Sequence, residues 1–185
     1  MAIPLARSSE EAQLYMTLNP CSCGQARFPA DSMLLSAGDE MLCRYATACP
    51  DCGQAREFLF RLPAEPEPRV SRDQVWFGGE HPSELIDAGQ WMWVAERYAG
   101  LHAADPRQLA PGELPRARAD LTFAVAAMDE AAKFVPPGAD GVPESAIWSD
   151  RGREEYRREP FRFRRSAIDA VREAYRGELA RLGQA

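Results

Sequence analysis

The residues best suited to chemistry are two close pairs of cysteines in the first third of the 185-residue chain. One residue separates Cys21 from Cys23 and two residues separate Cys49 from Cys52, and a glycine follows each pair. Glycine tolerates the positive φ that a tight turn around a metal needs. Because four thiolates in two such turns can bind one Zn²⁺ tetrahedrally, the sequence predicts a structural zinc site.

The segments that end the two pairs repeat each other. Cys-Gly-Gln-Ala-Arg occurs at 23–27 and again at 52–56, with Phe28 and Phe58 shortly after each. Two similar cysteine turns around one metal form the core of a zinc ribbon, so residues 19–65 resemble that fold class. The first pair departs from the usual spacing of two to four intervening residues. The resemblance implies a metal site and no activity.

The main alternative is that Cys49-Pro50-Asp51-Cys52 is a thioredoxin-like redox pair. Such a pair should open a helix within a βαβ unit, whereas residues 58–62 alternate like a strand. Cys43 is expected to be a small buried hydrophobic residue. Four thiolates leave no open coordination position, so we expect no metal-bound water for catalysis.

Outside the cysteines, the sequence shows no recognisable catalytic set. Histidine occurs only at 81 and 102, and Lys133 is the only lysine. Ser83 lies between His81 and Glu84, but we interpret it as the N-cap of a helix. We therefore expect that the protein is not an enzyme; an unrecognised active site in the helical part is an alternative.

Residues 151–165 form a second candidate site, because they hold seven arginines against three glutamates. Arginine makes bidentate contacts with phosphates, and interleaved aromatic rings can stack on bases. The candidate surface for a partner protein or a nucleic acid comprises Arg157, Arg158, Phe161, Arg162, Phe163, Arg164 and Arg165. The alternative is a face whose arginines pair with glutamates of the same chain.

Charge is divided unevenly along the chain. Residues 1–150 carry 12 basic and 22 acidic side chains, a net charge of −10, and residues 151–185 carry 10 and 6, a net charge of +4. The acidic body should repel nucleic acid. All basic residues except Lys133 are arginine, and this bias together with abundant alanine is typical of a GC-rich bacterial genome.

The N-terminus has no basic start followed by a long apolar run, and no segment approaches the ~18 apolar residues that span a bilayer. We therefore expect a cytoplasmic protein with no membrane contact. The reducing cytosol favours metal binding over disulfides for closely spaced cysteines.

Caps and periodicity predict the elements that position these residues. Ser8 and Glu11 have the spacing of a capping box for a helix that ends before Pro20. The other expected elements are strands at 40–48 and 55–62, and helices beginning at 83, spanning 89–99 and 116–134, and beginning near 166. The proline-rich stretch 63–72 is the expected boundary between a helix with a zinc ribbon (1–66) and a mainly helical domain (73–185). The predicted fold class is α+β.

Residues 12–24 and 146–153 resemble segments of an uncharacterised bacterial family of zinc-ribbon-containing proteins, a resemblance that implies no activity. We expect a non-enzymatic protein-interaction module that binds another protein in an accessory, regulatory or toxin-neutralising role. A nucleic-acid-binding or transcription-related zinc-ribbon protein is the alternative.

Overall fold

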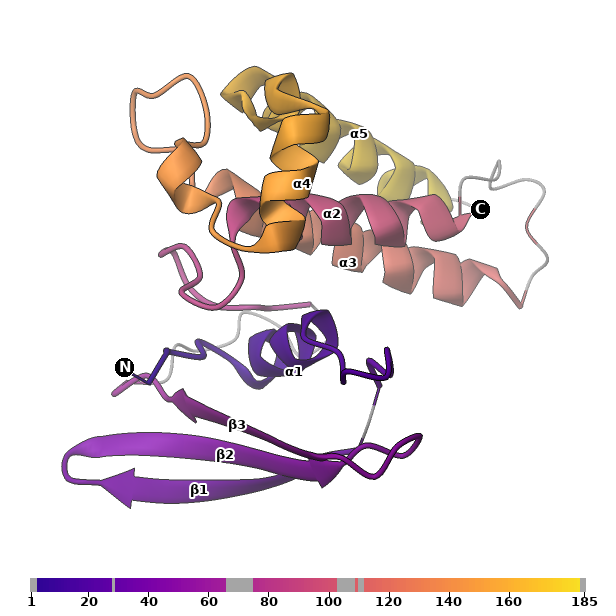
Figure 1. Cartoon of the computed structure of the whole chain (residues 1–185). Helices are drawn as coiled ribbons and strands as arrows, with labels where there is room; N and C mark the ends of the chain where they lie inside the picture. Colours follow the sequence, from indigo (N-terminus) through magenta and orange to yellow (C-terminus); the bar gives the residue numbers. More distant parts are fainter. Residues whose placement is uncertain (1–2, 28, 66–74, 103–108, 110–111, 184–185) are drawn as a thin grey trace. The chain divides into compact units, whose positions relative to one another are not determined.

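A computed structural model describes residues 3–27, 29–65, 75–102, 109 and 112–183. Most of the proline-rich boundary expected at 63–72 lies outside these residues, as does Phe28. The described part is α+β, with one three-stranded antiparallel sheet and five α-helices (Figure 1). The chain divides into two compact units. The first unit comprises Met1–Arg69, Trp76–Gly79 and Ser83–Leu85. The second unit comprises Val70–Val75, Glu80–Pro82 and Ile86–Ala185.

The first unit contains helix α1 and a sheet in the order β1-β2-β3. The bounds are α1 Ser9–Leu18, β1 Asp31–Ala37, β2 Glu40–Ala48 and β3 Ala55–Arg61. The helix after Ser8 and the last two strands agree with the elements predicted from the sequence, whereas β1 was not predicted. Residues of β1 and β2 pair without interruption from Asp31 opposite Ala46 to Ala37 opposite Glu40.

Helix α1 begins where its sequence predicts. The cap differs from the predicted capping box in that the Glu11 carboxylate accepts from the backbone N–H of Arg7 instead of that of Ser8. The Ser8 hydroxyl accepts a hydrogen bond from the Glu11 backbone N–H at 3.0 Å. The fully buried Glu11 carboxylate accepts from the Arg7 N–H at 2.7 Å and pairs with the Arg7 guanidinium. Tyr15 packs edge-on against Phe58 and Phe60, so α1 covers one face of the sheet.

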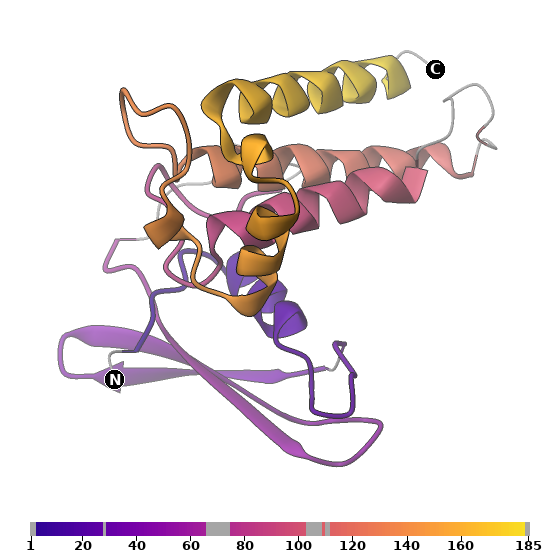
Figure 2. The same cartoon turned by 45° about the horizontal axis from the view of Figure 1, so that its top comes forward.

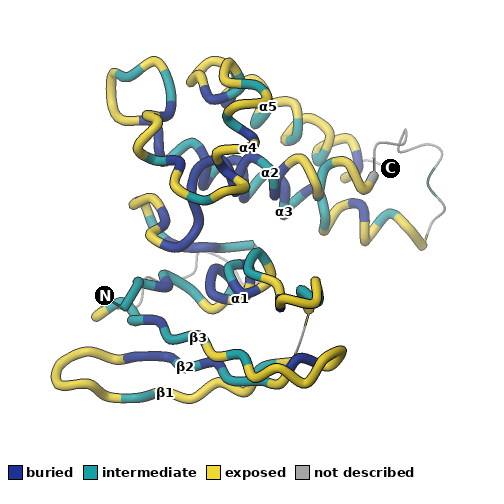
Figure 3. The backbone as a smooth tube through the Cα atoms, in the orientation of Figure 1, coloured by how far each residue is buried: buried dark blue, intermediate teal, exposed yellow. Residues whose placement is uncertain are grey.

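The two edges of the sheet differ. At the end of β3, the Arg61 N–H donates to the Pro4 carbonyl and the Arg61 carbonyl accepts from the Ala6 N–H, each at 2.9 Å. In the part of the chain that the structure describes, β1 pairs with β2 alone. Figure 3 shows that β1 is exposed along almost its whole length.

The second unit is helical. It contains α2 (Ala88–Ala99), α3 (Leu114–Ala132), α4 (Asp150–Arg158) and α5 (Arg165–Leu182), with short 3₁₀ turns η1 (Gly100–His102), η3 (Glu144–Ala146) and η4 (Pro160–Phe163). Helix α3 packs against both α2 and α5, and α4 packs against α2 (Figure 2). A core cluster joins Ala117, Leu121 and Ala124 of α3 to Leu182 of α5.

Asp87, which is completely buried, connects two of these helices. Its side chain caps α2 by accepting from the Gln90 N–H at 2.8 Å, and it also accepts from the N–H groups of Trp148 and Ser149 at 2.9 and 2.6 Å. A Cβ atom added at Gly152 of α4 would lie 2.3 Å from the Asp87 carboxylate, so only glycine allows this approach.

The prediction that Ser83 begins a helix is wrong. The Ser83 hydroxyl accepts from the N–H of Leu85, only two residues on, which is the geometry of a local turn. The helix expected at 89–99 is α2, which starts at Ala88 after the Asp87 cap. Among the described residues, no helix is both long and apolar enough to span a membrane.

Candidate metal centre and partner surface

The four predicted cysteines converge at one end of the sheet, where the segment after α1 meets the β2–β3 connection (Figure 1). Their sulfur atoms all lie within 4.8 Å of one another. Cys21 Sγ is 3.5 Å from Cys52 Sγ, and Cys23 Sγ is 3.6 Å from Cys49 Sγ. A disulfide needs about 2.05 Å, whereas sulfurs at the corners of a tetrahedron around zinc, each about 2.3 Å from the metal, are about 3.8 Å apart. The cluster therefore has the dimensions of a metal site.

Equivalent backbone hydrogen bonds shape the two cysteine knuckles, residues 21–25 and 49–54. In the first knuckle, the Cys21 N–H donates to the Gln25 carbonyl and the Gly24 N–H donates to the Cys21 carbonyl, both at 2.8 Å. In the second knuckle, the Cys49 N–H donates to the Gln54 carbonyl at 2.9 Å and the Gly53 N–H donates to the Cys49 carbonyl at 2.8 Å. Gly24 and Gly53 have φ values of +92° and +73°, so both turns use the left-handed backbone that glycine favours. The sequence repeat is thus a structural repeat.

Burial follows the same repeat. The first cysteine of each pair, Cys21 or Cys49, is only 2% exposed, and the second, Cys23 or Cys52, is exposed. Cys43 is buried on β2 opposite Phe60, outside the cluster. The short sulfur contacts join one knuckle to the other, and strand β3 follows the second knuckle. This arrangement disfavours a thioredoxin-like pair, which should open a helix.

Side chains tie the knuckles together beyond the sulfurs. Gln54 Oε1 accepts from the Ser22 hydroxyl at 2.8 Å and from Cys21 Sγ at 3.2 Å. Gln25 Nε2 donates to Asp51 Oδ2 at 3.0 Å. The cysteines alone were predicted from the sequence, but the repeat that contains the two glutamines was the visible signal for these supporting residues.

Proximity separates the pKa values of the thiols. The Cys23 backbone N–H lowers the pKa of Cys21 to about 6. The Gln54 N–H lowers the pKa of Cys52, but hydrogen bonds with the sulfurs of Cys21 and Cys23 outweigh it and raise that pKa to about 12. The thiols of Cys21 and Cys52 therefore do not ionise together by themselves, and a bound cation would supply the positive charge that neighbouring thiolates need.

The seven residues of the second candidate site fall into two groups, three arginines that are paired within their own unit and four residues that differ in exposure. Three of the arginines bind groups of their own unit. Arg158 pairs with Glu155 at 2.6 Å and with Glu96 at 3.1 Å, and Arg162 pairs with Glu96 at 3.2 Å. Arg165 donates to the carbonyl oxygens of residues 136 and 139 at 2.7 and 3.1 Å. These three arginines are therefore engaged by groups of their own unit.

The other four residues differ in exposure. Phe163 is 3% exposed and packs on Tyr156 with ring centroids 5.1 Å apart, whereas Phe161 is 60% exposed. Arg157 and Arg164 are exposed, and within the described residues their guanidinium groups make no hydrogen bond or ion pair. Phe161, Arg157 and Arg164 are thus the residues of this group that remain available to a partner.

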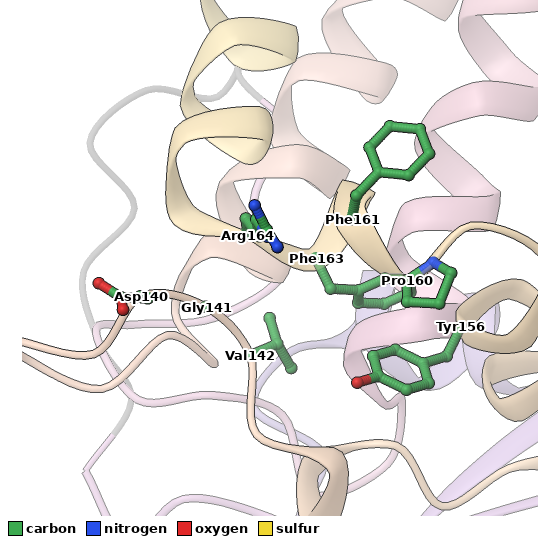
Figure 4. Close-up of a pocket in the computed structure, with 8 residues that line it drawn as sticks. All are labelled: Asp140, Gly141, Val142, Tyr156, Pro160, Phe161, Phe163 and Arg164. Carbon is green, nitrogen blue, oxygen red and sulfur yellow. The ribbon is translucent and has the colours of Figure 1, made fainter.

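A hollow of about 540 Å³ adjoins Phe161 and Arg164. It is lined by Asp140, Gly141, Val142, Tyr156, Pro160, Phe161, Phe163 and Arg164 (Figure 4). Its position is fixed by the Val142 N–H, which donates to the Phe163 carbonyl at 2.9 Å. The ring of Phe161 points away from those of Tyr156 and Phe163 in Figure 4. An exposed aromatic ring therefore lies beside an available arginine and a recess of mixed lining, which also contains Asp140.

No protein-family model, curated protein or solved structure matches the chain.

Proposed function

We propose that the first unit is a zinc ribbon that binds one structural Zn²⁺ through Cys21, Cys23, Cys49 and Cys52. The observation that carries this proposal is the distance between sulfurs of different knuckles, 3.5 and 3.6 Å, close to the edge of a ZnS₄ tetrahedron. Four sulfur ligands close the coordination sphere, so the metal has a structural role. Such a thiolate site suits a reducing compartment such as the cytoplasm.

The protein as a whole acts as a non-enzymatic interaction module that binds another protein. This role is supported by Phe161 and Arg164 beside the hollow, since aromatic and arginine side chains dominate the binding energy of many interfaces. The arginine offers bidentate recognition of a carboxylate. A partner segment with an acidic residue next to an apolar one fits this arrangement.

Selection from a displayed random-peptide library on the zinc-loaded protein tests the role. Selected peptides should combine Asp or Glu with a large apolar residue. For a synthetic peptide of the selected sequence, Phe161→Ala and Arg164→Glu should each weaken binding about tenfold or more. Arg118→Glu, an exposed charge reversal on α3, is the matched control and should leave the affinity unchanged. A peptide affinity that is unchanged by both Phe161→Ala and Arg164→Glu would contradict the proposed surface.

Nucleic-acid binding is the second candidate, because Arg157 and Arg164 are exposed and lack partners among the described residues. Fluorescence anisotropy with labelled single- and double-stranded oligonucleotides separates it from the first. Phosphate contacts would make the affinity fall steeply as salt rises. An absence of binding even at low salt would remove this candidate and leave the peptide result unaffected.

A further inference from the structure

We infer that two copies of the chain pair through strand β1, antiparallel and across a two-fold axis at Leu34, to make a continuous six-stranded sheet. This inference is independent of the proposed function and concerns a part of the molecule that neither the metal centre nor the hollow uses. The two edges of the sheet differ in how far they are protected.

An unprotected edge strand is a template for another strand, and monomeric proteins protect such edges with prolines, bulges, charges or a covering segment. The β3 edge is covered near Arg61 by residues 4–6. Strand β1 contains no proline or glycine, pairs with β2 without a bulge, and carries a single charge, Asp31, at its start. Among the residues that the structure describes, β1 therefore lacks these protections against edge pairing.

The side chains of β1 are also unusually apolar for exposed positions. Leu34 is 63% exposed and Met33 is 55% exposed. Met41, on β2 opposite Ser36 and one strand away from the edge, is 44% exposed. Burying the first two would be favourable, since apolar area contributes about 25 cal/mol per Å² removed from water.

The register between β1 and β2 determines which backbone N–H and C=O groups of β1 can pair with a further strand. Ala37 and Glu40 flank a two-residue turn, Gly38-Asp39, so they form a hydrogen-bonded pair. Bonded and non-bonded pairs alternate along an antiparallel ladder, which makes Leu34–Cys43 a non-bonded pair. The N–H and C=O groups of residues 32, 34 and 36 therefore point away from β2.

The sequence of the strand is complementary to itself in this register. With Leu34 opposite Leu34 of the second copy, Ser32 lies opposite Ser36 and Met33 opposite Leu35, and all seven residues of β1 are paired. Asp31 lies opposite Ala37, at opposite ends of the two strands, so no like charges meet. Residues 32, 34 and 36 would form about six new backbone hydrogen bonds.

Sedimentation velocity of the untagged, zinc-loaded protein over a range of concentrations should show a reversible monomer–dimer equilibrium. Leu34→Lys places two like charges against each other at the axis and should weaken the dimer by roughly 100-fold or more. Met41→Lys is the matched control: it exposes the same charge on the same sheet, away from the pairing edge, and should leave dimerisation unchanged.

A charge-swap experiment makes the test specific to this register. Leu34→Lys and Leu34→Glu chains should each be monomeric and should form a heterodimer when mixed, because residue 34 of one copy faces residue 34 of the other. Since Leu34 is exposed in the single chain, both variants should keep the circular dichroism spectrum of the wild type. A protein that stays monomeric, or a dimer that tolerates Leu34→Lys, would overturn the inference.

Discussion

Gln25 and Gln54 hold equivalent positions in the two cysteine knuckles, and the side chain of each ends on the opposite knuckle. Gln25 Nε2 lies 3.0 Å from Asp51 Oδ2, and Gln54 Oε1 lies 2.8 Å from Ser22 Oγ. The two turns are therefore joined by a pair of crossed hydrogen bonds as well as by their sulfurs. Groups outside the ligand set that orient ligands in this way raise the affinity of a metal site.

The crossed glutamines should matter for metal affinity without being ligands. Gln25→Ala or Gln54→Ala should weaken zinc binding by roughly 10–100-fold, the range found for supporting residues of metal sites. Competition with a chelator of known affinity measures the change. Gln13→Ala, an exposed glutamine on α1, is the control and should bind zinc like the wild type. Wild-type affinity in both knuckle variants would show that the crossed bonds are incidental.

The four-cysteine site should hold one zinc per chain. Substitution of any one of Cys21, Cys23, Cys49 or Cys52 by serine should abolish stoichiometric zinc and unfold the sheet, because a structural site contributes its binding energy to folding. Metal analysis by mass spectrometry gives the stoichiometry, and thermal unfolding reports the stability. The helical circular dichroism of the second unit should largely remain.

Cys43→Ala is the matched control for these variants. It removes a buried thiol outside the cluster, so zinc should stay at one per chain while stability falls by about 1 kcal/mol. A serine variant of the cluster that keeps a full zinc, or a Cys43 variant that loses it, would contradict the assignment.

The metal cluster could be predicted from the sequence because its information is local. Two cysteine pairs with adjacent glycines specify two turns, and strands 40–48 and 55–62 bring the second turn to the end of a hairpin. The same reasoning found α1, whose cap residues Ser8 and Glu11 are three apart. Each of these features needs only a few neighbouring residues.

The missed elements depend on contacts far apart in the sequence. Helix α4 is rich in arginine and carries no apolar stripe, but Asp87 binds the N–H groups just before it, 61 and 62 residues away. Strand β1 was missed because its apolar residues are exposed, so they do not alternate with polar ones. The periodicity of apolar residues shows which face of an element is buried, and neither segment has an apolar face of this kind: the buried residues of α4 are Gly152 and Glu155.

Replacing a knuckle glycine by a residue with Cβ should lower the stability of the first unit, because the glycine has a left-handed backbone conformation. Gly53, at φ +73°, has nothing within 4 Å of an added Cβ, so Gly53→Ala tests conformational strain without a clash. It should destabilise the first unit by about 1–2 kcal/mol, the cost of the left-handed conformation for a residue with Cβ. Chemical denaturation of the zinc-loaded protein measures this change.

Gly177→Ala is the control for the glycine test. Gly177 lies in α5, an added Cβ there also meets nothing within 4 Å, and its φ is not positive. Alanine should therefore stabilise that helix by roughly 0.5–1 kcal/mol. Equal effects of the two alanines would mean that the turn at Gly53 relaxes freely.

Glu155 should make the stability of the second unit depend on pH. The side chain is nearly fully buried, and burial raises its pKa above the ordinary value of 4.5; Arg158 acts in the opposite direction and Glu96 adds to the rise. Arg158 Nη2 lies 2.6 Å from Glu155 Oε2, but the two groups are not aligned for a hydrogen bond. The buried carboxylate is therefore incompletely compensated.

The direction of the pH effect follows from linkage. Because the pKa is higher in the folded chain than in the unfolded one, the folded state binds the proton more tightly, and ionisation of Glu155 costs stability as pH rises. The neutral variant Glu155→Gln avoids this cost. Its unfolding free energy relative to the wild type should increase from below pH 4.5 until the pH exceeds the raised pKa, and then stay constant.

Urea denaturation of both proteins at a series of pH values measures that difference. Glu154→Gln is the control, since Glu154 is an exposed neighbour on the same helix that pairs with Arg151, and its loss should change stability by no more than about 0.5 kcal/mol. A relative stability of Glu155→Gln that decreases as pH rises would mean that attraction to Arg158 outweighs burial. In that case the Glu155–Arg158 pair would stabilise the ionised carboxylate in the folded chain.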